Sequence, residues 1–143
     1  TAPPYCLLPA ANPLTQQSSV SMAQIALEPL VVLNRPVAAS YYEGLFQPGA
    51  RQAPVAAYVN STEMVRSIVA SGRGCAILNM RPLTTESYTG AKVVALPISD
   101  DLPPLTLAIG YDKSSPRRSV KDFVKACKTY FANASSSQCI LER

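Results

Sequence analysis

The sequence contains no histidine among its 143 residues. This absence excludes a His-based catalytic triad and the usual mixed Cys/His zinc sites. There is also no G-x-S-x-G motif and no nucleophile with an evident base, so we expect neither an enzyme nor a bound metal or other cofactor. No apolar run approaches the roughly 18 residues that a membrane span needs. We therefore expect no membrane partner.

Cysteine is scarce, and its four copies are far apart: Cys6, Cys75, Cys127 and Cys139. None belongs to a C-x-x-C pair. A framework of structural disulfides is not expected in a chain of this length with a sizeable core. Cys75 and Cys127 fall at apolar positions, where cysteine usually acts as a small buried hydrophobe. We expect reduced cysteines and a cytoplasmic protein.

The charge balance is modestly basic, with 13 basic and 9 acidic residues and a net charge of +4. The densest basic spots lie between residues 117 and 128, on what reads as the solvated face of a helix. No helix-turn-helix, zinc-finger or aromatic-basic signature accompanies them, so direct nucleic-acid binding by these residues is not expected. The chain fits one domain or two small lobes. It shows no signal peptide and begins at Thr1, so we expect a piece of a longer protein.

Short apolar runs alternate with segments of helical periodicity, which favours strands and helices in turn. Expected strands are Tyr5–Pro9, Leu30–Leu33, Val55–Val59, 75–78, 92–97 and 105–111. Expected helices are 18–26, with Ser21 near its start, 38–46, 60–70, and one that begins at Ser115 and Pro116. This order indicates right-handed crossovers around a largely parallel sheet.

The last helix carries an apolar face that reads as ordinary core packed on a sheet. Its members are Val120, Phe123, Val124, Cys127, Tyr130 and Phe131.

Residues 60–82 are the most informative stretch. Asn60 or Ser61 can cap the helix, and Glu63 stands close to the capping-box spacing. An apolar face follows, made of Met64, Val65, Ile68 and Val69. Gly72 and Gly74 then end the helix before the short buried strand 75–78. A helix start beside the end of a strand is where open α/β sheets bind small molecules.

Three motifs in order carry a resemblance to a known family. Residues 5–14, YCLLPAANPL, resemble the "VLPxxHPLA" strand and hinge of LysR-type transcriptional regulators, with Asn12 where histidine is common. Residues 28–33, EPLVVL, are similar to the "EPLVLL" strand of the effector domain in that family. Residues 61–78 resemble "SFEMVRSLVAAGLGVALL". The resemblance covers roughly residues 5–131, and the collinearity of the motifs makes it fairly specific.

This resemblance implies an α/β fold, the type 2 periplasmic-binding-protein-like fold, with two lobes of mainly parallel sheet. Residues 18–95 would form the second lobe, and residues 1–17 and 96–143 part of the first, whose other elements would lie upstream. The implied function is sensing of a small-molecule effector, with self-association as a dimer or tetramer. DNA would be bound only through an upstream winged helix-turn-helix. A solute receptor of a transport system shares the fold and is the alternative.

Candidate ligand residues follow the expected strands at their carboxyl ends. Arg35 could pair with a ligand carboxylate, or could be a surface loop residue. One tyrosine of the next helix is expected to line the cleft. Cap residues of the following helix could bind an anion or only serve the helix, and Arg81 is the one most readily explained as structural. The full set is Asn34, Arg35, Ser40, Tyr41, Ser61, Thr62, Asn79 and Arg81.

Overall fold

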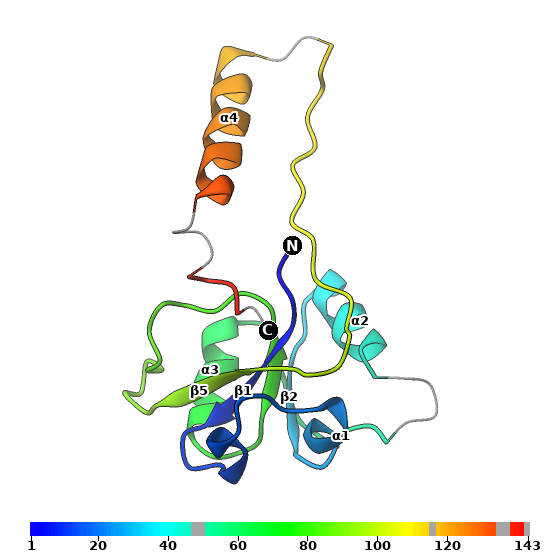
Figure 1. Ribbon diagram of the computed structural model, residues 1–143, viewed down its shortest axis with the longest axis vertical. Helices are drawn as coiled ribbons and strands as arrows, with labels where there is room; N and C mark the ends of the chain where they lie inside the picture. The colour runs from blue at the N-terminus through cyan, green and yellow to red at the C-terminus, as the bar shows by residue number, and fades with distance from the viewer. Residues whose placement is uncertain (47–50, 115–116, 134–137, 142–143) are drawn as a thin grey trace.

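The computed structural model describes residues 1–46, 51–114, 117–133 and 138–141. Strands and helices alternate through most of the described chain (Figure 1). In chain order they are β1 (Tyr5–Pro9), the 3-10 helix η1 (Pro13–Gln16), α1 (Met22–Ile25), β2 (Leu30–Leu33), α2 (Pro36–Gly44), β3 (Val55–Val59), α3 (Thr62–Ala70), β4 (Ala76–Leu78), β5 (Val93–Pro97) and α4 (Arg118–Ala132).

The strands form a mixed rather than a mainly parallel arrangement, which corrects one detail of the expected α/β fold. β2 and β3 pair in parallel, and a parallel bridge between Leu30 and Cys75 places β2 beside β4. β1 pairs with both β4 and β5 in antiparallel fashion, with Cys6 opposite Ile77 and Leu96. β1 starts at the edge where β4 ends, so it has to run in the opposite direction.

The core lies between this sheet and helix α3, which packs on β1 and β2. Val65 and Val69 are fully buried beneath the helix, as their spacing predicted. Met64, expected on the same face, is 50% exposed. Ile68 is half-buried against the core. The buried face of α3 is therefore narrower than the spacing of its apolar residues predicted, because only one side of the helix faces the sheet.

The helix caps differ from the expectation at α3. Ser61 occupies the cap position, yet its side chain makes no capping hydrogen bond. Glu63 turns instead to other partners, so the capping-box interpretation was wrong here. A complete capping box does form at α1, where Gln24 N donates to Ser21 Oγ at 3.2 Å and Ser21 N donates to the Gln24 side chain at 2.9 Å.

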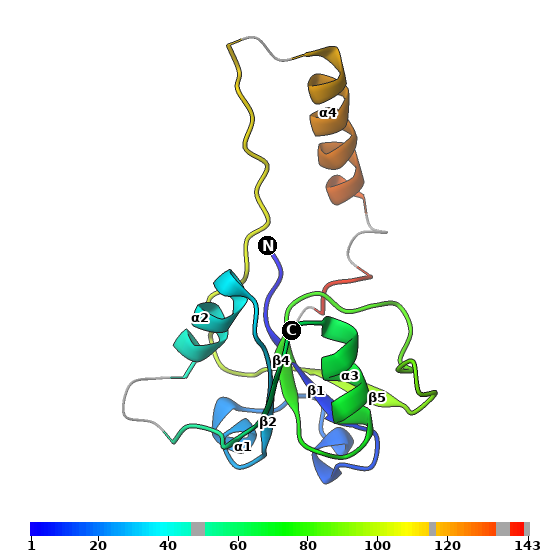
Figure 2. The same cartoon turned by 180° about the vertical axis from the view of Figure 1, so that it is seen from behind.

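Two expectations about the C-terminal part were wrong. Residues 105–111 form no strand: only Leu105 pairs, with Ala2, and no other described segment lies beside residues 106–111 to share backbone hydrogen bonds. The apolar face of α4 does not cover the sheet either. Val124 is buried, but Phe123 is 62% exposed and Tyr130 53%. Both views show this segment and α4 standing away from the body of the molecule (Figures 1 and 2).

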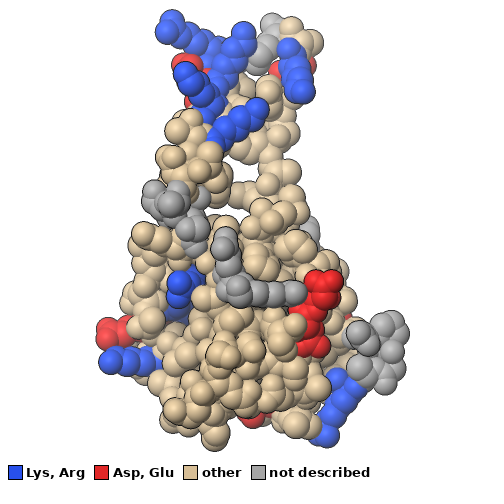
Figure 3. All heavy atoms as spheres, viewed as in Figure 1, with Lys and Arg blue, Asp and Glu red and all other residues tan. Residues whose placement is uncertain are grey.

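The basic residues of α4 do form a solvated face, as predicted. Arg118, Lys121, Lys125 and Lys128 are all exposed. Lys and Arg side chains gather over the end of this helix (Figure 3). Their expected helical start at Ser115 and Pro116 lies outside the described residues. Among the described helices, none is long and apolar enough to cross a membrane.

Candidate functional site

Three neighbouring strands are each followed by an asparagine at the same edge of the sheet. Asn34 follows β2, Asn60 follows β3 and Asn79 follows β4. Leu33 lies opposite Val59 in the parallel ladder, and the backbone N–H of Asn34 donates to the Val59 carbonyl at 2.7 Å. Helices α2 and α3 both begin at this edge. The arrangement is the one in which open α/β sheets hold ligands, outside the carboxyl ends of parallel strands.

Asn79 links this edge to the two segments that lead away from it. Its side chain is buried, and its amide nitrogen donates to the Ala2 carbonyl and to the Tyr41 hydroxyl, both at 2.9 Å. The Tyr41 hydroxyl donates in turn to the Pro103 carbonyl at 2.8 Å. Ala2 and Leu105 exchange two backbone hydrogen bonds, of 2.8 and 2.9 Å. One asparagine therefore connects β4, α2 and both crossing segments.

Tyr41 acts in this network as a neutral hydroxyl. Burial raises the pKa of its phenol above the ordinary value of 10.0, and the hydrogen bond from Asn79 opposes part of that rise. The ring also packs edge-on against Tyr42, with the ring centroids 5.2 Å apart. Tyr42 is buried, so of the two tyrosines it is Tyr41 that reaches the edge of the sheet. Near neutral pH, the phenol of Tyr41 can both donate and accept.

Arg81 lies two residues further along, half-buried. Its backbone N–H donates to the Cys139 carbonyl at 2.9 Å, which brings the C-terminal segment against the end of β4. Its Nε atom is buried and has no hydrogen-bond partner in the described chain. Asn79 Oδ1 shares that property. Buried polar atoms are nearly always paired in native proteins, so two unpaired atoms of opposite character at one edge need an explanation.

The other predicted residues are less closely joined to this network. Asn34, Arg35 and Ser40 are exposed, and among the described residues none of their side chains makes a hydrogen bond. Ser61 and Thr62 are half-buried at the start of α3. Ser61 lines a shallow hollow of about 260 Å³ on the outer side of that helix, and no hydrogen bond within the described chain joins it to Asn79.

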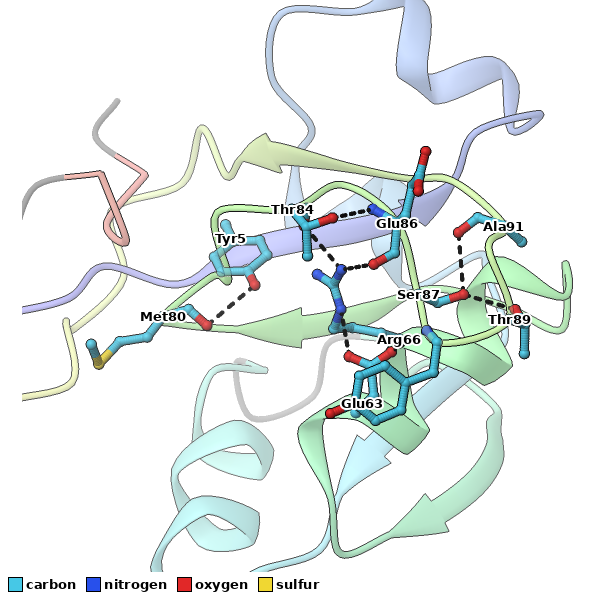
Figure 4. Close-up of polar contacts among 10 residues, drawn as sticks. Tyr5, Glu63, Arg66, Met80, Thr84, Glu86, Ser87, Thr89 and Ala91 are labelled. Atoms are coloured by element: carbon cyan, nitrogen blue, oxygen red, sulfur yellow. Dashed lines mark hydrogen bonds and ion pairs between the residues drawn. The ribbon is translucent and has the colours of Figure 1, made fainter.

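A further polar network, centred on Arg66, was missed by the sequence interpretation (Figure 4). The Arg66 side chain is 2% exposed and forms an ion pair with Glu63 at 2.9 Å. It also donates to the carbonyls of Thr84 and Glu86, at 3.0 and 2.6 Å. Glu63 accepts from the Tyr88 backbone N–H at 2.7 Å. The i, i+3 spacing of Glu63 and Arg66 on a helix could have predicted their ion pair. The same spacing is equally typical of an exposed pair on a helix surface.

Within the described part of the chain, the cysteines belong to no cluster that could hold a metal ion. The structure describes no group of three or more histidine, cysteine, aspartate or glutamate residues able to hold a metal ion. All four cysteines are free. The thiol of Cys75 hydrogen-bonds to that of Cys6 and, together with burial, raises the pKa of Cys6 well above 9.0. A buried, protonated thiol of this kind is unreactive.

The fold and this edge define an α/β ligand-binding module. The family model of the LysR substrate binding domain matches residues 1–132, and the chain belongs to that family. It is a family of ligand-binding portions of transcriptional regulators, which favours a regulator over a receptor of a transport system. No curated protein matches the sequence.

Solved structures agree with this assignment. HinK, a LysR family transcriptional regulator from Pseudomonas aeruginosa, is 28% identical with a TM-score of 0.83; the match covers 90% of this chain and 45% of HinK. The PA01 protein of Pseudomonas aeruginosa is 25% identical with a TM-score of 0.80, covering 92% of this chain and 47% of that protein. The C-terminal domain of a LysR family regulator from Rhodococcus sp. RHA1 is 25% identical with a TM-score of 0.74, covering 89% and 63%. The chain thus spans less than half the length of the first two.

Proposed function

We propose that this chain is part of the effector-sensing domain of a cytoplasmic LysR-type transcriptional regulator. It binds a small carboxylate-bearing metabolite, and occupancy changes how its lobes and subunits are arranged. The observation that carries the proposal is the family match across residues 1–132. DNA is contacted by another part of the regulator, since no helix-turn-helix, zinc-finger or aromatic-basic signature accompanies the basic residues of this chain.

The ligand lies at the edge where β2, β3 and β4 end. Helix starts favour negative charge, hydroxyl groups add donors, and an arginine supplies a planar fork for a carboxylate. Asn79 supplies a buried side chain to this site, and Tyr41 and Arg81 supply half-buried ones. Exposed or half-buried groups at the same edge complete it: Asn34, Arg35, Ser40, Ser61 and Thr62.

The test is calorimetric titration of the chain with a panel of aliphatic and aromatic carboxylates, each paired with its uncharged amide. We expect some carboxylates to bind and their amides to bind far more weakly. Arg81→Ala should weaken carboxylate binding by about ten- to a hundredfold, because one charge-assisted contact contributes about 1.5–3 kcal/mol. Arg117→Ala, at an exposed position on the start of α4, is the control and should leave binding unchanged. Failure of every carboxylate to bind would contradict the proposal.

A further inference from the structure

The crossing segment that follows β5 is anchored to the body of the molecule at its beginning. The Ser99 N–H donates to the Val20 carbonyl at 2.9 Å, and the Asp100 carboxylate accepts from the first N–H of α1 at 2.8 Å. Residues 101–104, Asp-Leu-Pro-Pro, then lead to Leu105. Because proline has no N–H, positions 103 and 104 cannot donate to a neighbouring segment. The chain can therefore change direction within this short stretch.

Two side chains of the body hold the crossing segments beyond that stretch. Asn79, at the end of β4, donates to the Ala2 carbonyl at 2.9 Å, and Tyr41 of α2 donates to the Pro103 carbonyl at 2.8 Å. Asn79 also donates to the Tyr41 hydroxyl at 2.9 Å, which joins the two contacts. The segment after β5 passes beside α2 (Figures 1 and 2). One continuous chain of hydrogen bonds thus fastens both crossing segments.

The protons of this chain run in one direction. The Ala2 carbonyl can only accept, so the amide nitrogen of Asn79 has to face it. The second amide proton goes to the Tyr41 hydroxyl, which gives its own proton to Pro103. Tyr41 is therefore an acceptor toward the body and a donor toward the crossing segment. Loss of its hydroxyl would remove two of the three hydrogen bonds.

We propose that Asn79 and Tyr41 form a hinge lock that an effector carboxylate opens. While the hydrogen bonds are made, both crossing segments leave the sheet in one fixed direction. A carboxylate at this edge competes with the Pro103 carbonyl for the Tyr41 proton, and a charged acceptor forms the stronger hydrogen bond. Release of Pro103 then lets the chain beyond it turn about residues 101–104. The inference rests on the proposed function for the presence of a carboxylate at this edge.

The backbone amide of Leu105 reports the state of the hinge lock. Its N–H donates at 2.9 Å to the Ala2 carbonyl, the same oxygen that Asn79 holds. Opening of the lock exposes this N–H to water, so its hydrogen exchange becomes faster. One neutral hydrogen bond corresponds to about a three- to tenfold change in such a local equilibrium.

The first experiment measures hydrogen exchange residue by residue by NMR. Tyr41→Phe should raise the exchange rate of the Leu105 amide about three- to tenfold. The amides of Asn34 and Ser99 should exchange as before, because their acceptors, the Val59 and Val20 carbonyls, belong to the body. A merely structural role of Tyr41 would instead raise the exchange of all three amides together, through lower overall stability.

Tyr42→Phe is the matched control. Tyr42 is the neighbouring tyrosine of the same helix, and no hydrogen bond to either crossing segment is described for its hydroxyl. This variant removes the same atom from the same kind of residue. The Leu105 amide should exchange as it does in the unmodified chain.

The second experiment adds the carboxylates of the titration panel, succinate and benzoate among them. In the unmodified chain, each acid that binds should raise the exchange rate of the Leu105 amide at least about threefold at saturation. In Tyr41→Phe the lock is already open, so the same acids should have little further effect on this amide.

The outcomes separate this inference from the proposed function. Unchanged Leu105 exchange in Tyr41→Phe would overturn the hinge lock, and a carboxylate that binds without affecting Leu105 would overturn its opening. Both results would leave carboxylate sensing standing. If no carboxylate binds, the proposed function fails together with the opening step, and the variants still decide whether the lock exists. If thermal unfolding shows that Tyr41→Phe does not fold, the response of the unmodified chain to bound acids decides.

Discussion

Single residues in this protein fasten segments that are distant in the sequence. Arg66 is the clearest case, because one buried guanidinium reaches Glu63 on its own helix and two carbonyls of the loop between β4 and β5. That loop has little apolar anchorage of its own: Leu83 is 71% exposed and Tyr88 91%. The position of the loop therefore depends on the arginine.

Replacing Arg66 should destabilise the folded protein. Arg66→Met keeps most of the side-chain volume but leaves the carbonyls of Thr84 and Glu86 without their donor. We expect the free energy of unfolding to fall by about 3 kcal/mol, the scale for removing one partner of a buried ion pair. Arg118→Met is the control, since Arg118 is 96% exposed and stands 3.9 Å from Asp122. Chemical denaturation measures both, and equal small effects would show that the loop does not depend on Arg66.

At the scale of elements, the entry of β4 into the sheet depends on close backbone contact. Cys75 N donates to the Pro29 carbonyl at 2.8 Å, immediately after Gly74. Gly74 has a φ of 141°, and a Cβ there would overlap the Pro29 carbonyl oxygen. Only glycine satisfies both conditions. The Gly-x-Gly turn thus ends α3 and also lets β4 lie beside β2.

Gly74→Ala should destabilise the protein by roughly 2–4 kcal/mol, through both backbone strain and displacement of β4. Gly44→Ala is the matched substitution: Gly44 lies in α2, has an ordinary backbone conformation and has open space around its Cα. It should be neutral or stabilise by up to about 1 kcal/mol. Thermal unfolding of both variants tests this, and a tolerated Gly74→Ala would contradict the account.

At the scale of the whole molecule, apolar surface remains on the part that stands away from the body. Leu107 is 68% exposed and Ile109 43%, and Phe123 of α4 is also largely exposed. Several large apolar side chains thus face solvent on these two segments, and extensive exposed apolar surface usually marks an interface.

We therefore expect the chain to self-associate at micromolar concentration. The double variant Leu107→Ser with Phe123→Ser should raise the dissociation constant at least about tenfold, because burial of two large apolar side chains contributes about 1.5–3 kcal/mol each. Tyr88→Ser removes an exposed aromatic from the loop between β4 and β5 and should leave association unchanged. Analytical ultracentrifugation measures all three, and a monomer at high concentration would refute the prediction.

Local patterns in the sequence were sufficient to predict the positions of most strands and helices. Strands β1, β2 and β3 lie where their apolar runs predicted. β1 and β2 are buried along almost their whole length, whereas β3 is largely exposed. The family assignment also followed from motifs in order. Of the candidate site, Asn79 and Arg81 were predicted from their positions after a strand and Tyr41 from the helix that follows β2, and the structure joins Tyr41 and Asn79 directly. Whether these residues bind a ligand stays a prediction.

The sequence by itself determined the family, the alternation of strands and helices, and the residues that end β2 and β4. These depend on interactions between near neighbours, which periodicity and turn chemistry reveal. Only the tertiary structure decided that β1 runs antiparallel, that residues 105–111 form no strand and that Arg66 is buried. Each of these depends on which distant segment lies alongside. A local pattern of residues shows that a segment must pack or pair with another one, but it does not show which segment that is. The same holds for Asn79, whose unpaired oxygen is visible only once Ala2 and Tyr41 have taken its two protons.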